Sequence, residues 1–203
     1  MNRLIAMAAA ILLTAPGLAQ SQSAAPEIVD KYIAESWKTA AAEWKQRIVQ
    51  DETMKACSQH RNNPPKPVFD AILAREKALI QYPTDGKFLG DWKKGAAAAQ
   101  DGYGQRFTDR DTTRPNGANC YACHQLDPKE VSFGTVGPSL VKYGKLRNYG
   151  AEETKVAYER IYNAQASFAC SNMPRFGHNR ILTVEQIKDV LAFLMDPESP
   201  VNK

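Results

Sequence analysis

Hydrophobic residues recur every three or four positions through the segment 27–55, with charged residues on the positions between them. This spacing is the period of one face of an α-helix, so it predicts one long amphipathic helix over roughly 27–55. Two asparagines and two prolines at 62–65 should end this helix, because proline cannot continue one. Pro67 suits the first turn of a second helix that closes near Pro83. Together these elements predict a helical hairpin ahead of the main domain.

Two more helices are expected in the middle of the chain. The first starts at Asp91 and runs through the alanines at 96–99. The stretch 101–117 that follows is rich in glycine and aspartate and should be a loop. The second helix is expected over 152–163, between this loop region and the C-terminal part of the chain.

The last helix is the best marked of all. Thr183 can cap its N-terminus, with Gln186 three residues later as the reciprocal partner of a capping box. A stripe of aliphatic residues follows at helical spacing, and Pro197 should stop the helix. No segment alternates hydrophobic and polar residues over any length. The predicted fold class is therefore mainly α.

The N-terminus has the features of a secretory signal peptide. Arg3 gives a positive start, an apolar run covers 4–13, and small residues end at Ala19. We therefore expect residues 1–19 to be removed on export, so that the mature chain begins near Gln20. Export would place the protein in an oxidising compartment, where spare thiols tend to pair.

Composition and charge exclude several classes of protein. The 203 residues are 43% hydrophobic, enough to fill a core, so most of the chain should not be disordered. The net charge of +4 comes from interspersed charges, which argues against nucleic-acid binding. No apolar run beyond the N-terminal one approaches a membrane span, so no membrane anchor is expected. The mature chain is expected to divide into an N-terminal helical extension, 20–85, and a main domain, 86–203.

The sequence Cys120-Tyr121-Ala122-Cys123-His124 is a C-x-x-C-H motif, the attachment site of c-type haem. Two thiols three positions apart can each form a thioether with a porphyrin vinyl group, and the imidazole of His124 can then bind the iron. A redox-active dithiol is the alternative, because C-x-x-C alone serves that purpose. The adjacent histidine and the export signal favour one covalent haem c.

The sequence Gly137-Pro138 follows the proximal histidine by fourteen residues. The carbonyl of Pro138 can accept the Nδ1 proton of His124, which would fix the imidazole so that Nε2 meets the iron. Taken alone, a Gly-Pro pair is only a turn, and that reading stays open.

Elimination narrows the sixth iron ligand. Met195 follows the apolar stripe of the last helix, where a methionine usually belongs to the core, and Met54 lies far upstream. Met173 remains, in a loop with proline and glycine that could fold over the far face of a haem. His178 and His60 are the alternatives. Methionine ligation raises the potential relative to two imidazoles and fills the coordination sphere, which suits passing one electron.

Two cysteines are left over, Cys57 and Cys170. An even remainder in an exported chain suggests one disulfide, which would tie the extension to the loop that carries Met173. A reactive thiol or two inert free thiols are the alternatives. Arg175, two residues after Met173, could pair with a haem propionate, although a solvated surface cation is an equal reading.

From about residue 115 onward the chain resembles SoxX, the family of monohaem cytochrome c subunits of the SoxAX complex of bacterial sulfur oxidation. The matching segments are Cys-Tyr-Ala-Cys-His-Gln-Leu (120–126), Gly-Thr-Val-Gly-Pro-Ser-Leu (134–140), Ile-Tyr-Asn-Ala (161–164), Cys-Ser-Asn-Met-Pro-Arg-Phe-Gly (170–177) and Asp-Pro-Glu-Ser-Pro-Val-Asn (196–202). The resemblance implies a class I cytochrome c fold in the main domain, with His124 and Met173 as axial ligands. It says little about residues 20–85.

The same resemblance implies partners and a place of action. They are a SoxA-like cytochrome subunit forming a heterodimer, a SoxYZ-like sulfur carrier reached through the complex, and a soluble cytochrome that accepts the electrons, all in the periplasm. The joint reaction would couple thiosulfate oxidatively to a cysteine of the carrier, as in an L-cysteine S-thiosulfotransferase, with this subunit non-catalytic alone. A free-standing periplasmic electron carrier for another redox enzyme is the alternative.

Overall fold

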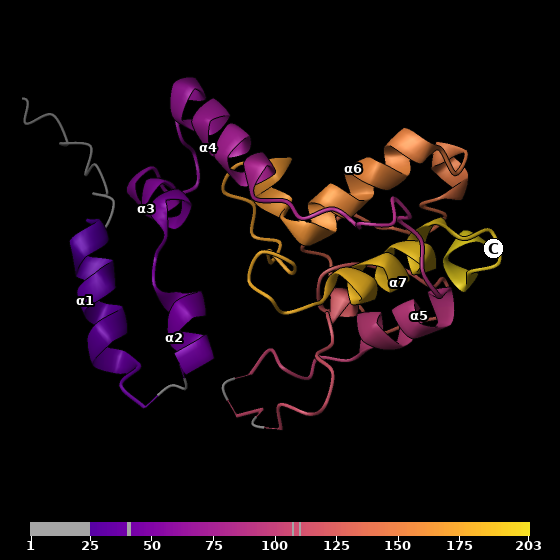
Figure 1. Ribbon diagram of the computed structural model, residues 1–203, viewed down its shortest axis with the longest axis horizontal. Coiled ribbons are helices and arrows are strands. Elements are labelled where there is room, and N and C mark those ends of the chain that lie inside the picture. The colour runs from indigo at the N-terminus through magenta and orange to yellow at the C-terminus, as the bar shows by residue number, and fades with distance from the viewer. Residues whose placement is uncertain (1–24, 40–41, 107, 110) are drawn as a thin grey trace, which may run out of the picture.

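The computed structural model describes residues 25–39, 42–106, 108–109 and 111–203 (Figure 1). Over these residues the chain forms α-helices and short 3₁₀ turns without a β-strand, which confirms the mainly α class. The expected signal peptide, 1–19, lies outside the described residues. The α-helices are α1 (Pro26–Ser36), α2 (Ala42–Ile48), α3 (Glu52–Gln59), α4 (Lys66–Ala78), α5 (Trp92–Gln100), α6 (Ala151–Tyr162) and α7 (Val184–Met195).

Helices α5 and α7 cross in close contact at the centre of the main domain (Figure 1). Both helices begin where the sequence predicts. The Asp91 side chain accepts a hydrogen bond from the Lys93 amide of α5, and Thr183 and Gln186 form the capping box of α7. At the crossing Gly95 faces the backbone of α7, and a Cβ there would lie 1.9 Å from the Asp189 carbonyl oxygen. Only glycine allows the two backbones to approach this closely.

Helix α6 packs against α7 and completes the main core. It begins and ends one residue before the expected bounds of 152–163. The segment 101–117 was expected to be a loop, and its described residues contain no helix or strand. Tyr158 of α6 is completely buried and stacks between Tyr82 and Tyr162. Met195 is also buried, as expected for a core methionine.

The C-terminal tail closes the end of α7. The Asn202 side-chain amide donates to the carbonyls of Leu194 and Asp196, and its oxygen accepts from the amides of Gly144 and Lys145. Carbonyls at the end of a helix have no partner within the helix, so Asn202 satisfies groups that would otherwise stay unpaired. The tail therefore links the end of α7 to the segment that follows the C-x-x-C-H motif.

The single helix expected over 27–55 is wrong, because three helices occupy this part of the chain. Helix α1 ends at Ser36, and α3 begins after Asp51, whose side chain accepts a hydrogen bond from the Met54 amide. Asp51 lies inside the predicted helix, and its extended backbone makes it an N-cap that starts a new helix instead of continuing one. Hydrophobic residues do recur at helical spacing in this segment, but the N-cap at Asp51 starts a new helix within the predicted one.

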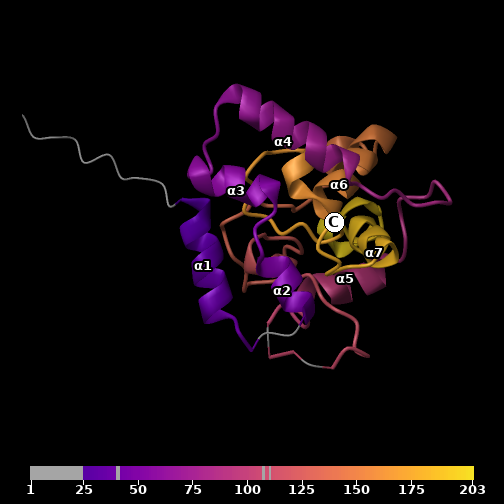
Figure 2. The same ribbon diagram turned by 60° about the vertical axis from the view of Figure 1, so that its left-hand side comes forward.

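Helix α4 begins near Pro67 as predicted, although it ends at Ala78, before Pro83. It lies beside the short turn at Ala164–Ala166 in both ribbon views (Figures 1 and 2). A small hydrophobic cluster joins α3 and α4 to the segment after this turn, with Cys57, Ile72, Ala169 and Cys170 at its centre. The extension thus packs on the main domain at the segment that leads to Met173.

Replacing Gly95 with alanine should lower the free energy of unfolding by about 1–3 kcal/mol, because the added methyl group must push α5 away from α7. Urea denaturation measures the change. Lys94→Ala, at an exposed position of the same helix, is the control and should stay within about 0.5 kcal/mol of wild type. Equal stability of Gly95→Ala and wild type would contradict the close crossing.

Candidate functional site

The C-x-x-C-H motif forms a tight turn. Cys120–Ala122 make one 3₁₀ turn, entered through Asn119 in the left-handed conformation, and the His124 amide donates to the Cys120 carbonyl at 2.9 Å. The thiols of Cys120 and Cys123 are not joined to each other. Burial raises the pKa of the Cys120 thiol to about 12. A raised pKa leaves less thiolate at Cys120, and the thiolate is the reactive form of a redox dithiol.

The imidazole of His124 is oriented by the Gly137-Pro138 turn. Its Nδ1 lies 2.7 Å from the Pro138 carbonyl oxygen, which can only accept, so Nδ1 carries the proton and Nε2 is the nitrogen with a lone pair. The Gly137 amide donates to the Cys123 carbonyl at 2.8 Å, which fixes the turn against the motif. A Cβ on Gly137 would come within 2.1 Å of the His124 ring. Glycine is therefore required for the backbone to lie this close to the imidazole.

These residues fit a covalent haem c in the chemistry of their donors. Cys120 and Cys123 offer two unpaired sulfurs at the spacing of thioether attachment. His124 offers an imidazole whose Nδ1 is already hydrogen-bonded, as is usual for a metal-binding histidine. They would hold the porphyrin and the proximal side of its iron.

Met173 lies in the loop between α6 and α7. The loop begins at Cys170, which has a positive φ of 61°, and the Met173 amide donates to the Ser171 hydroxyl at 3.2 Å. The Met173 side chain is half-buried and packs against the main core. Of the other candidates, Met54 lies in α3 of the extension and Met195 within the core of α7.

Cys57 and Cys170 form a disulfide, with their Cα atoms 5.4 Å apart. The bond joins α3 of the extension to the residue where the Met173 loop begins. Both cysteines are buried in the small cluster shared with Ile72 and Ala169. The loop is therefore attached covalently to the extension three residues before Met173.

Arg175 corrects one expectation, because the structure places its side chain in the interior and not in solvent as a surface cation. Its side chain is buried, with Nη1 3.1 Å from Glu76 Oε2 and Nη2 2.6 Å from Asp51 Oδ2. Two carboxylates of the extension already take both terminal nitrogens, and they satisfy a cation that could not stay buried unpaired. The loop is thus attached to the extension a second time, two residues after Met173.

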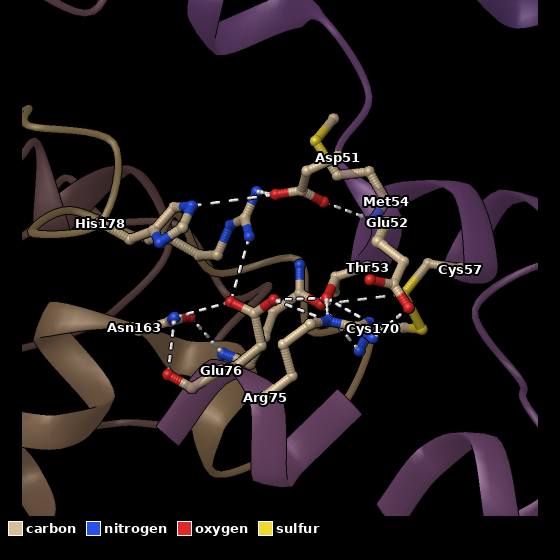
Figure 3. Close-up of polar contacts among 12 residues, drawn as sticks. Asp51, Glu52, Thr53, Met54, Cys57, Arg75, Glu76, Asn163, Cys170 and His178 are labelled. Carbon is tan, nitrogen blue, oxygen red and sulfur yellow. Dashed lines mark hydrogen bonds and ion pairs between the residues drawn. A yellow bond between two sulfur atoms is a disulfide. The ribbon is translucent and has the colours of Figure 1, made fainter. Parts of the chain in front are cut away.

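Glu76 is the more deeply buried of the two carboxylates that bind Arg175, and both of its oxygens have polar partners (Figure 3). Asn163 donates to its Oε2 at 2.7 Å, and the Thr53 hydroxyl donates to its Oε1. Desolvation by burial acts to raise the pKa of Glu76, but the hydrogen bonds from Asn163 and Thr53 and the charge of Arg175 outweigh it and leave the pKa below its ordinary value. Glu76 is therefore held as a carboxylate.

Asp51 and His178 form the outer part of the cluster. Burial acts to raise the pKa of Asp51, but the Met54 amide and Arg175 lower it overall. His178 Nε2 lies 3.8 Å from Asp51 Oδ2, turned toward the extension (Figure 3). Burial and the charge of Arg175 lower the pKa of His178, which favours its neutral form.

The sequence analysis missed the carboxylates of this cluster. Asp51 carried a detectable signal, since an aspartate three residues before an amide at a helix start is a common cap. Glu76 carried none. It lies between two basic residues on an ordinary helix, and its partner Arg175 is 99 residues away.

Comparison with known proteins identifies the main domain. Residues 116–196 match the family model described as cytochrome c. A protein of Aquifex aeolicus (strain VF5), described as an uncharacterized lipoprotein, is 43% identical over 162 residues, which cover 78% of this chain and 76% of the relative. The 162 aligned residues are more than the range 86–203 contains, so the similarity continues toward the N-terminus into the extension.

Acid should destabilise the fold through Asp51 and Glu76. Their pKa values in the fold lie below the ordinary 3.8 and 4.5, so the unfolded chain binds more protons in this range. The two carboxylates contribute fully to the free energy of unfolding at a pH above their ordinary pKa values. This contribution is lost as the pH falls through their lower pKa values in the folded protein. Urea denaturation between pH 6 and pH 2 should show stability falling with pH. Asp51→Asn should make stability depend less steeply on pH. The control is Asp70→Asn, at an exposed ion pair on α4, which should leave the pH dependence unchanged. An equal pH dependence of stability in the two variants would contradict the assignment.

Proposed function

The chain belongs to the same family as the Aquifex lipoprotein and contains a cytochrome c domain, and we propose that it is an extracytoplasmic electron-transfer protein with one covalent haem c. Cys120 and Cys123 would carry the thioethers, with His124 and Met173 as axial ligands. The observation that carries this assignment is the 2.7 Å contact between His124 Nδ1 and the Pro138 carbonyl, which leaves Nε2 for iron. The haem supplies a one-electron couple.

The residues around the motif perform three tasks in this proposal. Pro138 and Gly137 hold the imidazole of His124 in one tautomer and one orientation. The loop 170–177 presents the Met173 thioether, a ligand that favours reduced iron. The disulfide at Cys170 and the ion pairs of Arg175 keep that loop in one position. A preorganised pair of ligands suits electron transfer, because little must move when the charge changes.

Two parts of the chain have different roles. Residues 86–203 would form the cytochrome c domain, which is supported by the family match at 116–196 and by the α5–α7 crossing. Residues 20–85 would form the extension that holds the Met173 loop. The relative's similarity to part of this segment supports treating the extension as a feature of the family.

We further propose that the protein serves as the electron-accepting subunit of a SoxAX-like complex. The Met-Pro-Arg-Phe-Gly segment at 173–177 and the Ser-Pro-Val-Asn tail at 199–202 support this role by their resemblance to SoxX. The tail has a structural task here, because Asn202 bonds α7 to the segment after the haem motif.

The chemistry of the chain supports a partner for the sulfur reaction. The proposed haem would engage Cys120 and Cys123, and the disulfide engages Cys57 and Cys170, so none of the four cysteines of the sequence would remain as a nucleophile in the haem-loaded protein. A nucleophile with a placed base is needed for S–S bond formation. The coupling of thiosulfate to a SoxYZ-like carrier would therefore take place on a SoxA-like subunit, and a soluble cytochrome would take the electrons onward.

The periplasm is the proposed location. The signal-like residues 1–19 support export, and the relative's description as a lipoprotein also belongs to an exported protein. No helix among the described residues is long and apolar enough to cross a membrane. Osmotic shock should release the protein, whereas recovery only from detergent-treated membranes would indicate attachment of the kind named for the relative.

The mature protein should carry one haem that acid acetone does not extract, with a mass increase of one haem per chain, because thioethers survive denaturation. Met173→Ala should keep this haem but lose the charge-transfer band of methionine-bound ferric haem at the red end of the spectrum. Met195→Leu is the control and should keep the band, since Met195 lies within the core. Retention of the band in Met173→Ala would refute the ligand assignment.

The isolated protein should be reducible but inactive in coupling thiosulfate to a carrier cysteine. Adding the SoxA-like subunit should restore the activity, and the two should co-purify from the periplasm. Met173→Ala should weaken the restored activity, because its haem accepts electrons at a lower potential. Thiosulfate turnover by the isolated chain would refute the subunit role, and purification with an unrelated redox enzyme would favour the free-standing carrier.

A further inference from the structure

The loop that carries Met173 is fixed to the N-terminal extension on both sides of the methionine. Cys170, three residues before it, is bonded to Cys57 of α3. Arg175, two residues after it, is paired with Glu76 of α4 and with Asp51 at the start of α3. The extension therefore controls both ends of a six-residue segment whose centre presents the thioether.

We propose that Glu76 is a positioning residue for Met173, acting through the Arg175 guanidinium. The inference rests on the proposed function, since it takes Met173 as an iron ligand. Among the described residues, no hydrogen bond or ion pair joins Glu76 to Met173 or to the C-x-x-C-H motif. Its effect is to hold the Arg175 side chain, and with it the backbone two residues beyond the methionine.

Burial explains why Glu76 matters more than Asp51. The side chain of Glu76 is 2% exposed and that of Arg175 is 6% exposed, whereas that of Asp51 is 37% exposed and partly screened by water. Removing the Glu76 charge leaves the buried Arg175 with the partly screened Asp51 as its remaining carboxylate partner. Without the Glu76 charge, Arg175 gains by turning toward solvent, and the loop must move with it.

Other contacts limit how far that movement spreads. The Phe176 side chain is buried in the main core, and the Gly177 amide donates to the Tyr162 carbonyl at 2.9 Å. A Cβ on Gly177 would lie 2.3 Å from the Tyr162 ring, so this part of the chain is packed tightly. Loss of the Glu76 contact should therefore loosen residues 171–175 while the rest of the domain stays folded.

Competition by imidazole measures how firmly Met173 is held. Imidazole binds ferric iron only in molecules whose methionine has left, so its apparent affinity rises with the fraction of open molecules. Glu76→Gln, which keeps the shape of the side chain and removes its charge, should bind imidazole roughly tenfold more tightly than wild type. Asp70→Asn is the matched control on α4, because Asp70 pairs only with exposed Lys66, and its affinity should not change.

A double variant separates a positioning role from a general loss of stability. In Met173→Ala the sixth position is open already, so adding Glu76→Gln should leave the imidazole affinity unchanged. If Glu76→Gln does not fold, Thr53→Val removes one hydrogen bond to the Glu76 carboxylate and should shift the affinity in the same direction by less.

Each outcome decides the proposal. Wild-type imidazole affinity in a folded Glu76→Gln protein of lower thermal stability would overturn it, because Glu76 would then be only structural. A shift of equal size in the Met173→Ala background would overturn it too, since the effect would not pass through Met173. If wild type and Met173→Ala bind imidazole equally, the ligand assignment itself fails, which is a failure of the proposed function rather than of the Glu76 contact.

Discussion

The Arg175 guanidinium is buried, and a buried cation is stable only where carboxylates compensate it. In this protein the carboxylates come from Glu76 and Asp51, which lie 99 and 124 residues earlier in the chain. Thr53 and Asn163 complete the hydrogen bonding of Glu76, so the cluster is fully connected. The position of α3 and α4, and that of the loop 170–177, follow from this one requirement.

The cluster also explains why a cytochrome c domain carries an extension. The main core is built mostly by α5, α6 and α7, and Ile80, near the end of the extension, is among its buried residues. The extension also packs where the loop 170–177 begins, with the Cys57–Cys170 disulfide inside the small hydrophobic cluster. The similarity to the Aquifex relative reaches into this segment of the chain.

Signals within a few residues predicted most helices and the C-x-x-C-H motif. The contacts of Glu76 and Asp51 with Arg175 join distant parts of the chain and could not be predicted in this way. The capping box of Thr183 and Gln186 and the C-x-x-C-H motif each lie within five residues, so their pattern is readable directly. The start of a new helix at Asp51 was missed because two local signals disagree there. The hydrophobic spacing favours one continuous helix, whereas the Asp51 side chain caps the start of α3. Glu76 had no local signal, because its role depends on Arg175, far along the chain.

The most direct test of the account is the strength of the methionine band in a protein without the disulfide. Cys57→Ser combined with Cys170→Ser removes the covalent link between the extension and the Met173 loop while leaving the haem cysteines unchanged. The absorbance of the methionine–ferric band, measured per haem at neutral pH, should be clearly weaker in this variant than in wild type, because the loop then has one attachment fewer. An equal band in the two folded proteins would contradict the claim that the extension holds the axial methionine.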